Sequence, residues 1–351
     1  MTTTSANHTD TRSAGAPSAL RAFITGLSGL DLIDAERRFL AEADPWGLII
    51  FARNVETPDR LAGLVADARD ATGRHVPVLI DQEGGRVARL RPPHWRDWPS
   101  ARETVHRLGP EAGATALRLR FTVIAHELQA LGIDVDCMPL LDVPQTDVHP
   151  IIGERALGED LASVVSMGQA VIDGLMTGGV LPVIKHIPGH GRGSVDSHLS
   201  LPRVAASRVE LEAVDFAAFK PFADVHLGMT AHVLFDAIDP DTCATNSPDC
   251  IKVIREEIGF GGLLMTDDLS MKALEGSVGD RASRALEAGC DIALHCNGEM
   301  SEMEEVAAAV PPLSGTPLAR ARAAEEARPA PSSFDLDAVL AEYHALTGEM
   351  A

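Results

Sequence analysis

Eight short apolar segments recur along this chain, and each is followed by polar or glycine-rich residues and then by a stretch with helical periodicity. Most are continuous apolar runs rather than alternating ones, which is typical of parallel strands that are covered on both faces. They lie at 22–25, 47–51, 76–80, 133–138, 181–184, 227–231, 262–266 and 291–294. Eight strands, each followed by a crossover helix, predict an α/β fold that consists of a single (β/α)8 TIM-type barrel.

The stretches between these runs have the spacing of amphipathic helices. Apolar residues recur three and four positions apart over 161–175, and 116–131 carries a similar stripe. An open doubly wound sheet would also alternate strands with helices, but it would gather its polar residues at one switch point. We expect a disordered polar tail over 1–16, the barrel over 17–326, and a linker with a final helix packed on the barrel over 327–351.

Composition excludes several kinds of partner. The 351 residues include 30 Lys and Arg against 51 Asp and Glu, and the resulting formal net charge of −21 repels nucleic-acid backbones and anionic membranes. Aromatic residues make up 4% of the chain, which argues against a surface that stacks bases or grips a long polymer. We therefore expect a small-molecule substrate, with neither nucleic acid nor membrane as a partner.

The cysteines and the first residues predict the compartment. The five cysteines form no CxxC pair, and an odd number cannot all pair within one chain, so we expect buried thiols in a reducing environment. The first sixteen residues contain no apolar signal-peptide core, and no uninterrupted run of 18 apolar residues is present. The sequence therefore predicts a cytoplasmic protein.

Polar side chains directly follow seven of the eight predicted strands. In a closed barrel the carboxyl ends of the strands converge on one mouth, where barrel enzymes place their active sites. Adjacent residues point to opposite sides of a strand, so in the pair after the seventh strand we expect one side chain in the mouth and the other capping the next helix. The strand-end residues are Arg53, Asp81, Asp142, Lys185 and His186, His232, Asp267 and Asp268, and His295 and Asn297.

The densest polar cluster is KHIPGHGRGSVDSH, residues 185–198. It would suit a metal site by composition, but a Pro-Gly pair separates His186 from His190, so these two cannot share a helical face and we expect no metal. A Schiff-base role for Lys185 needs a deprotonated amine, which a mouth rich in carboxylates disfavours. A charged lysine that donates hydrogen bonds to ligand hydroxyls is the better interpretation.

Within the same cluster, Asp196 and His198 are two residues apart in a glycine-rich loop, so their side chains can lie on one side. The carboxylate can then orient an imidazole that acts as general acid in one step and as base in the next. A carboxylate in the mouth and an acid/base on a loop are the minimum parts of a double-displacement glycosidase, although most such enzymes use two carboxylates.

These motifs resemble one known family. KHIPGHGRGSVDSH is similar to the signature of the N-acetylglucosaminidase branch of glycoside hydrolase family 3, and the resemblance covers roughly residues 22–300. The departures are small: Ile187 stands where many members have Phe, and Gln82 where many have His. The other stretches that carry the resemblance, in the same order, are ITGLSG, PWGLIIFARN, DQEGGRVARLR, GIDVDCMPLLDV, IGERALG, MTAHV, GFGGLLMTDDLSMKAL and EAGCDIALHCNG.

Matched motif by motif, the resemblance implies that Asp267 is the nucleophile, that His198 is the acid/base and that Asp196 orients His198. It also implies a set of sugar-binding residues, of which the two arginines come from the resemblance alone. No metal and no other cofactor is implied. The implied sugar-binding residues are Asp81, Arg89, Arg155, Lys185 and His186.

The implied activity is that of a retaining exo-β-N-acetylglucosaminidase of peptidoglycan recycling. Its substrate would be an N-acetylglucosaminyl-anhydromuramyl peptide, and a single barrel of this type is expected to act as a monomer. Two alternatives remain open. A neutral histidine base does not repel phosphate, so the enzyme could instead be a phosphorylase. From a different class, the chain could be a sugar-binding barrel without catalysis.

Overall fold

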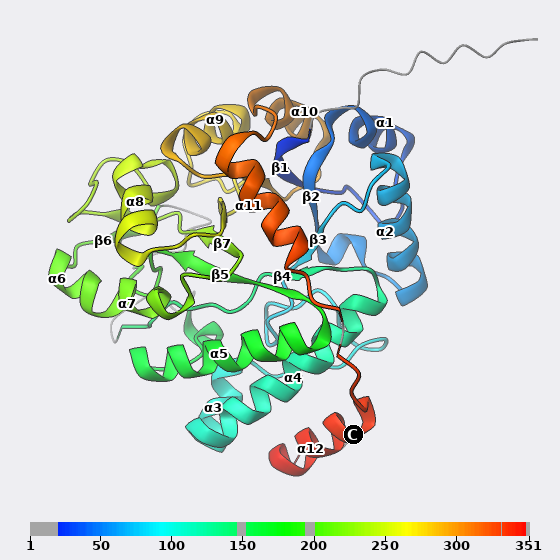
Figure 1. Ribbon diagram of the computed structural model, residues 1–351, viewed down its shortest axis with the longest axis vertical. Coiled ribbons are helices and arrows are strands. Elements are labelled where there is room, and N and C mark those ends of the chain that lie inside the picture. Colours follow the sequence, from blue (N-terminus) through cyan, green and yellow to red (C-terminus); the bar gives the residue numbers. More distant parts are fainter. Residues whose placement is uncertain (1–19, 146–151, 194–200, 331, 349–351) are drawn as a thin grey trace, which may run out of the picture.

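The computed structural model describes residues 20–145, 152–193, 201–330 and 332–348. Eight parallel strands form one sheet in the order β10-β1-β2-β3-β4-β5-β7-β9, and a bridge between Met265 and Ile292 joins its two edges. The predicted barrel is therefore confirmed, and the open doubly wound sheet is excluded (Figure 1). The strands are β1 (Arg21–Gly26), β2 (Pro45–Ile50), β3 (Val78–Ile80), β4 (Val135–Asp136), β5 (Leu181–Ile187), β7 (Leu227–Thr230), β9 (Leu263–Met265) and β10 (Ala293–His295).

Helices surround this barrel, and each apolar segment of the sequence corresponds to one of its strands. The two stretches with clear helical spacing are α4 (Pro110–Ala130) and α5 (Leu161–Gly178). The other helices of the outer layer are α1 (Asp34–Ala43), α2 (Pro58–Thr72), α3 (Ala101–Leu108), α6 (Arg208–Glu210), α7 (Phe216–Phe219), α8 (Pro248–Lys252), α9 (Val278–Ala288) and α10 (Met300–Ala309).

Short elements fill the connections after β5 and β7. The helical connection after β5 contains the π-helical turn Leu211–Asp215, and that after β7 contains the π-helical turn Val253–Ile258. Two two-residue strands, β6 (Arg203–Val204) and β8 (Leu234–Phe235), pair in parallel outside the barrel. The sequence showed no signal for this pair because two residues are too few for a periodic pattern.

Helix α11 (Gly315–Glu326) lies across the amino-terminal end of the barrel (Figure 1). This helix and the residue that follows it closely contact residues at or just before the amino-terminal ends of the strands. Trp46 Nε1 donates to Glu325 Oε1 at 2.8 Å, and Arg320 Nη1 lies 3.0 Å from Asp291 Oδ1. Arg328, just beyond the helix, pairs with Asp134. The opposite, carboxyl-terminal end of the barrel is where the large polar cavity described below opens.

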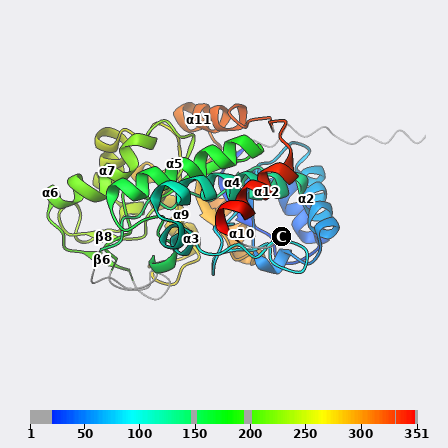
Figure 2. The same ribbon diagram turned by 90° about the horizontal axis from the view of Figure 1, so that it is seen from below.

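The final helix, α12 (Leu336–Thr347), packs on the outer layer against α4 (Figure 2). The Asp335 side chain caps it by accepting hydrogen bonds from the backbone N–H groups of Asp337 and Ala338. The Tyr343 ring meets the Trp98 ring edge-on, with 5.3 Å between centroids and 89° between planes. The predicted polar tail, 1–16, lies outside the described residues.

Helix α5 is apolar enough to meet the length and hydropathy expected of a membrane span. Its 18 residues have a mean hydropathy of 1.2, and half of them are buried inside the protein. Polar residues and glycines interrupt this stretch, so it is not an uninterrupted apolar run in the sequence. Here the helix is part of the barrel's outer layer and packs along α4 and β5.

Two glycines, Gly174 and Gly178, allow α4 and α5 to approach closely. A Cβ atom at Gly174 would overlap the Arg118 carbonyl oxygen of α4 and lie 2.9 Å from the Phe121 Cβ. A Cβ at Gly178 would lie 2.9 Å from the Thr122 carbonyl oxygen. Most of the neighbouring atoms belong to the backbone of α4, so neither site can make room by a side-chain rotation.

We expect Gly174→Ala to lower the free energy of unfolding by about 1–3 kcal/mol, because the added methyl group must push two helices apart. Gly63→Ala is the matched control, since Gly63 also lies in a helix but has no atom within 4 Å of the position that a Cβ would take. The control should gain up to about 1 kcal/mol from better helix propensity. Urea denaturation measures both, and equal effects in the two variants would contradict the packing argument.

Candidate active site

A cavity of about 320 Å³ opens at the carboxyl ends of the barrel strands. This volume is near the lower end of the ~300–1,000 Å³ range of ligand pockets, so it suits one sugar ring better than a polymer. Four charged side chains of the lining, Asp81, Arg89, Arg155 and Lys185, form what is called the charged wall below. The lining residues are Ile49, Phe51, Asp81, Arg86, Val87, Arg89, Ile152, Arg155, Lys185, His186, His190, Met229, Asp267, Asp268, Met271, Leu294 and Cys296.

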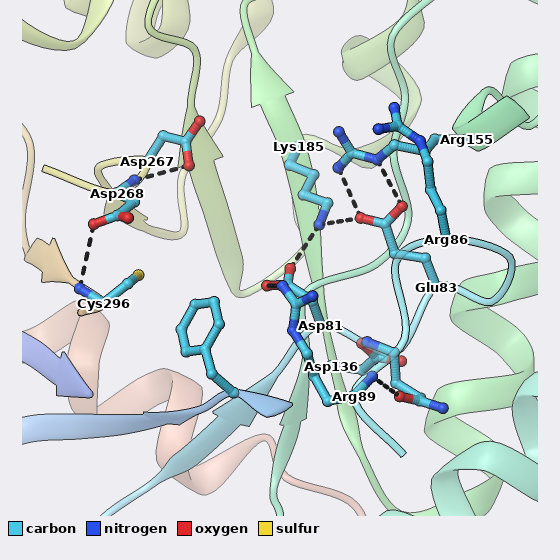
Figure 3. A network of polar contacts seen from close by, with 12 residues as sticks. Asp81, Glu83, Arg86, Arg89, Asp136, Arg155, Lys185, Asp267, Asp268 and Cys296 are labelled. Atoms are coloured by element: carbon cyan, nitrogen blue, oxygen red, sulfur yellow. Dashed lines mark hydrogen bonds and ion pairs between the residues drawn. The ribbon is translucent and has the colours of Figure 1, made fainter. Parts of the chain in front are cut away.

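Asp81 follows β3 and joins two cations on the charged wall of the cavity (Figure 3). Its Oδ1 lies 2.9 Å from Lys185 Nζ, and its Oδ2 lies 2.9 Å from Arg89 Nη2. Burial alone would raise the pKa of Asp81, but the charges of Lys185 and Arg89 outweigh it and hold that pKa well below its usual range. Asp81 is therefore an anion at any pH at which the enzyme would work.

Glu83 is a second buried carboxylate in this network, and it was not among the site residues predicted from the sequence. Arg155 Nε and Nη2 donate to its two oxygens at 2.9 and 2.8 Å, and Lys185 Nζ lies 2.7 Å from Oε1. Burial raises its pKa, yet Arg155 and Lys185 together lower it to about 2. The signal in the sequence was the Gly84-Gly85 pair, whose positive φ angles of 92° and 57° turn the chain sharply and direct Glu83 inward.

Lys185 sits between these two carboxylates and its side chain is 2% exposed. Burial would lower its pKa, but Asp81 and Glu83 raise it above the usual range. The amine therefore stays protonated, which disfavours the Schiff-base alternative and favours hydrogen-bond donation to a ligand. Burial would also lower the pKa of Arg155, but its ion pair with Glu83 outweighs burial and raises that pKa above the usual range.

Gln82, one of the departures from the family pattern, organises the loop that carries Arg89. Its Oε1 accepts from the backbone N–H groups of Arg89 at 2.8 Å and Leu90 at 3.0 Å, and its Nε2 donates to the Leu90 carbonyl at 3.0 Å. The Arg89 guanidinium also lies 4.8 Å from the centre of the Phe51 ring. The buried Gln82 side chain, which both donates and accepts hydrogen bonds, therefore fixes the backbone of the loop at Arg89 and Leu90.

Lys185 and His186 are adjacent on β5, yet both line the cavity. A regular strand would point them to opposite faces, but the pairing of β5 with β7 shifts register between Ile184 and Ile187. The imidazole is held from behind by Asp142, whose Oδ2 lies 2.8 Å from His186 Nδ1. With Nδ1 occupied, Nε2 is the nitrogen left to meet a ligand.

Asp142 also fixes the next histidine of the cluster. Its Oδ1 accepts from the His190 backbone N–H at 2.6 Å. The His190 side chain lines the cavity and is 3% exposed, and burial lowers its pKa to about 4, so it is neutral near pH 7. Burial alone would raise the pKa of Asp142, but the neighbouring His186 outweighs burial and holds that pKa below its usual range. Asp142 thus supports the cavity without lining it.

Asp267 and Asp268 follow β9 on the side of the cavity opposite Lys185 (Figure 3). Asp267 Oδ1 accepts from the Asp268 backbone N–H at 2.8 Å. Burial raises the pKa of Asp267, but its polar surroundings, which include this N–H and the charge of Lys185, outweigh burial and lower that pKa below its usual value. Both aspartates border the cavity, which differs from the expected single inward side chain. Asp268 caps no helix; it closes a turn by accepting from Ser270 N at 2.9 Å and ties that turn to Cys296 N at 3.2 Å.

Six of the eight predicted site residues therefore meet around one cavity: Asp81, Arg89, Arg155, Lys185, His186 and Asp267. The predicted acid/base His198 and its partner Asp196 lie outside the described residues, which omit 194–200. Five other strand-end residues do not line the cavity: Asp142, described above, and Arg53, His232, His295 and Asn297. Arg53 donates to the Leu27 carbonyl, His232 bonds Thr245, and His295 and Asn297 both bond Glu302 of α10.

Within residues 20–145, 152–193, 201–330 and 332–348, no group of three or more His, Cys, Asp or Glu side chains is arranged to hold a metal ion. His186 and His190 are close, with 5.7 Å between ring centres, but Asp142 already occupies His186 Nδ1. The five cysteines are all buried free thiols.

The fold and the cavity together define a barrel enzyme whose site takes a small, polar ligand. The glycosyl hydrolase family 3 N-terminal domain matches residues 25–327. A β-hexosaminidase of Alkalilimnicola ehrlichii is 38% identical over 279 residues, covering 78% of this chain and 79% of its own length. One of Nitrosomonas eutropha is 34% identical over 277 residues, covering 77% and 79%.

Solved structures agree with these matches. NagZ from Neisseria gonorrhoeae, in complex with N-trifluoroacetyl-D-glucosamine, superposes with a TM-score of 0.81 at 29% identity and covers 94% of this chain and 97% of its own. The chain belongs to glycoside hydrolase family 3. It is a glycoside hydrolase of the β-hexosaminidase type, within the branch that the sequence motifs resembled.

Glu83→Gln tests the buried network by its pH dependence. The pKa of Glu83 falls from 4.5 to about 2 on folding, so its stabilising contribution is complete above about pH 5 and is lost as the pH falls towards 2. Between pH 7 and 2.5, wild type should lose on the order of 3 kcal/mol more unfolding free energy than Glu83→Gln does. Glu159→Gln, which breaks an exposed pair with Arg102, is the control and should follow wild type.

Chemical denaturation at a series of pH values measures this difference. Parallel pH curves for wild type and Glu83→Gln would contradict the ion-pair assignment of Glu83.

Proposed function

We propose that this chain is a retaining exo-β-N-acetylglucosaminidase that acts as a cytoplasmic monomer in peptidoglycan recycling. Its substrate would be N-acetylglucosamine linked to 1,6-anhydro-N-acetylmuramic acid that carries a peptide. The observation that carries the proposal is the cavity of about 320 Å³, with the Lys185 network on one wall and the Asp267 carboxylate on the other. The related NagZ structure, which was solved with an N-acylated glucosamine, supports the sugar assignment.

The charged wall can bind the terminal sugar of a chain. Asp81 accepts hydrogen bonds from sugar hydroxyls, while Lys185 and Arg89 donate to them, and each of these groups is already oriented by its ion-pair partners. Polar groups that are fixed before binding lose little freedom when the ligand arrives. We take the ligand of this wall to be the non-reducing terminal sugar, so that cleavage is exo.

Asp267 can then act as the nucleophile on the anomeric carbon. Its lowered pKa keeps it ionised at neutral pH, and its position opposite Lys185 directs it at a sugar bound to the charged wall. In the first step Asp267 forms a glycosyl ester while His198 protonates the departing oxygen. In the second step neutral His198 removes a proton from water, and the water oxygen attacks the anomeric carbon of the ester. The bond from that carbon to Asp267 breaks, which frees the carboxylate and releases the sugar with retained configuration. Asp196 orients His198 in both steps.

Asp267→Ala tests the nucleophile. The variant should lose at least about a thousandfold in kcat on a nitrophenyl N-acetylglucosaminide, because the covalent intermediate cannot form. Added azide should restore part of the activity and give a glycosyl azide of inverted configuration. Full turnover by Asp267→Ala without an added nucleophile would overturn the assignment. His198→Ala should instead lose most activity on substrates with poor leaving groups, which depend on protonation.

Digestion of purified anhydro-muropeptides tests the substrate and the stereochemistry. We expect free N-acetylglucosamine and anhydromuramyl peptide, with the β-anomer of the sugar appearing first in the NMR spectrum. The same reaction in phosphate buffer distinguishes the phosphorylase alternative, which would release the sugar 1-phosphate. Glucosides should be cleaved far more slowly, and initial release of the α-anomer would refute a retaining mechanism.

A further inference from the structure

His232 follows β7 in the MTAH motif, but the proposed mechanism gives it no task. The side chain is fully buried and does not line the cavity. Its Nδ1 lies 2.7 Å from Thr245 Oγ1, and its Nε2 lies 3.1 Å from the carbonyl oxygen of Asp268. A buried imidazole with a partner on each nitrogen is a fixed part of a hydrogen-bond network, and here one partner is next to the proposed nucleophile.

The network continues on the other side of Thr245. Thr245 Oγ1 lies 2.8 Å from Thr230 Oγ1, and Thr230 Oγ1 accepts from the backbone N–H of Asp267 at 3.3 Å. Thr230 and Thr245 are both fully buried. The chain of bonds therefore starts at the Asp267 N–H and ends at the Asp268 carbonyl. We call Thr230, Thr245 and His232 the histidine–threonine clamp.

Hydrogen-bond chemistry fixes the direction of every proton in this clamp. A carbonyl can only accept, so His232 Nε2 carries the proton that is donated to Asp268. Burial lowers the pKa of His232, so the ring is neutral and Nδ1 is an acceptor. Thr245 must then donate to Nδ1, and its oxygen accepts from the Thr230 hydroxyl, whose own oxygen accepts from Asp267 N–H.

One alternative acceptor exists for Thr245. Its Oγ1 lies 3.1 Å from the carbonyl oxygen of Ala231, to which it could donate instead. That arrangement would leave Nδ1 of a neutral, buried His232 without a donor, which is costly. The clamp is therefore complete in one arrangement, with the His232 ring uncharged.

We propose that Thr230, Thr245 and His232 are positioning residues for Asp267. The clamp binds the backbone N–H of Asp267 and the backbone carbonyl of Asp268. It therefore fixes the main chain that carries the Asp267 carboxylate, and with it the direction from which this carboxylate attacks. None of its donors bonds a carboxylate oxygen of Asp267. The proposal rests on the proposed function, because it takes Asp267 as the nucleophile.

A neutral clamp suits a nucleophile that must give up its charge. Asp267 is an anion before the attack and part of a neutral ester after it, so a protonated imidazole beside it would stabilise the starting state more than the transition state. A clamp that acts through main-chain atoms orients the carboxylate without this penalty. Misplacement of a reacting group by about 1 Å can cost about a hundredfold in rate.

Thr245→Val and Thr245→Ser form a matched pair that tests the clamp. Valine keeps the shape but removes the donor to His232 and the acceptor for Thr230, whereas serine keeps the hydroxyl. We expect Thr245→Val to lower kcat on a nitrophenyl N-acetylglucosaminide about 10- to 100-fold with KM within about twofold. Thr245→Ser should stay within about threefold of wild type in kcat.

Thr122→Val controls for the loss of a buried threonine hydroxyl in general. Thr122 lies in α4, and its hydroxyl bonds the Arg118 carbonyl of the same helix at 2.9 Å. Its kcat should stay within about twofold of wild type, whatever happens to its melting temperature. Titration with a fluorinated glycoside that traps the ester counts the active sites, so each kcat refers to folded enzyme only.

The outcomes separate the clamp from the proposed function. A kcat for Thr245→Val within twofold of wild type, or equal losses in the Val and Ser variants, would overturn the clamp. Loss of kcat in Val with recovery in Ser supports it. Thr230→Val and Thr230→Ser give the same test if Thr245→Val does not fold. Failure of the proposed function would be recognised separately, by an active Asp267→Ala variant.

Discussion

The buried ion-pair network around Lys185 is the interaction on which the site depends. Two carboxylates, Asp81 and Glu83, form ion pairs with three cations, Lys185, Arg89 and Arg155, at distances of 2.7–2.9 Å. Moving any one of these charges out of water costs several kcal/mol, and only the partners offset that cost. If one member is removed, another charge stays buried without its ion-pair partner, which is strongly destabilising. The network is better understood as a device that holds polar groups in place for a ligand than as a source of stability.

The rest of the barrel keeps this network in place. The Gly84-Gly85 turn fits tightly under the next loop, since a Cβ at Gly84 would lie 2.7 Å from the Pro99 carbonyl oxygen. Arg120 of α4 donates to that same Pro99 carbonyl at 2.8 Å and to the Glu83 carbonyl at 3.3 Å. The Trp98 ring beside Pro99 packs on Tyr343 of α12. Elements far apart in the sequence thus support the one loop that carries Glu83 and Arg89.

A third buried carboxyl group lies near the Lys185 network, but it carries only part of a negative charge at neutral pH. Asp136, at the end of β4, is buried, and its Oδ1 accepts from the Gln82 backbone N–H at 3.0 Å. Burial, with Asp81 and Glu83 adding to it, raises the pKa of Asp136 to about 7. Asp136 is therefore only partly ionised near neutral pH. A third full negative charge would compete with Asp81 and Glu83 for Lys185, and the low dielectric around Asp136 avoids this.

The sequence predicted the barrel and much of the cavity because parallel strands end at one face. Apolar runs located the strands, and the residue after each run located Asp81, Lys185 and Asp267 at the same end. The position after a strand does not determine the direction of a side chain, however. His295 and Asn297 turn away to Glu302, and the irregular end of β5 turns both Lys185 and His186 inward. Glu83 was missed because its direction depends on the turn after it and on Arg155, which is 72 residues away in the chain.

The two walls of the cavity make opposite use of charge, and this difference is consistent with the chemistry proposed for each. On the Lys185 wall, every ionised group is paired and stays ionised throughout a reaction, so its contribution is to binding and orientation. On the Asp267 wall, the clamp formed by His232, Thr245 and Thr230 is uncharged and reaches the carboxylate only through its main chain. A group that must form a covalent bond cannot be tied to a strong ion-pair partner without losing reactivity. Fixed charge for the sugar and neutral support for the nucleophile are therefore complementary requirements, and one barrel mouth meets both.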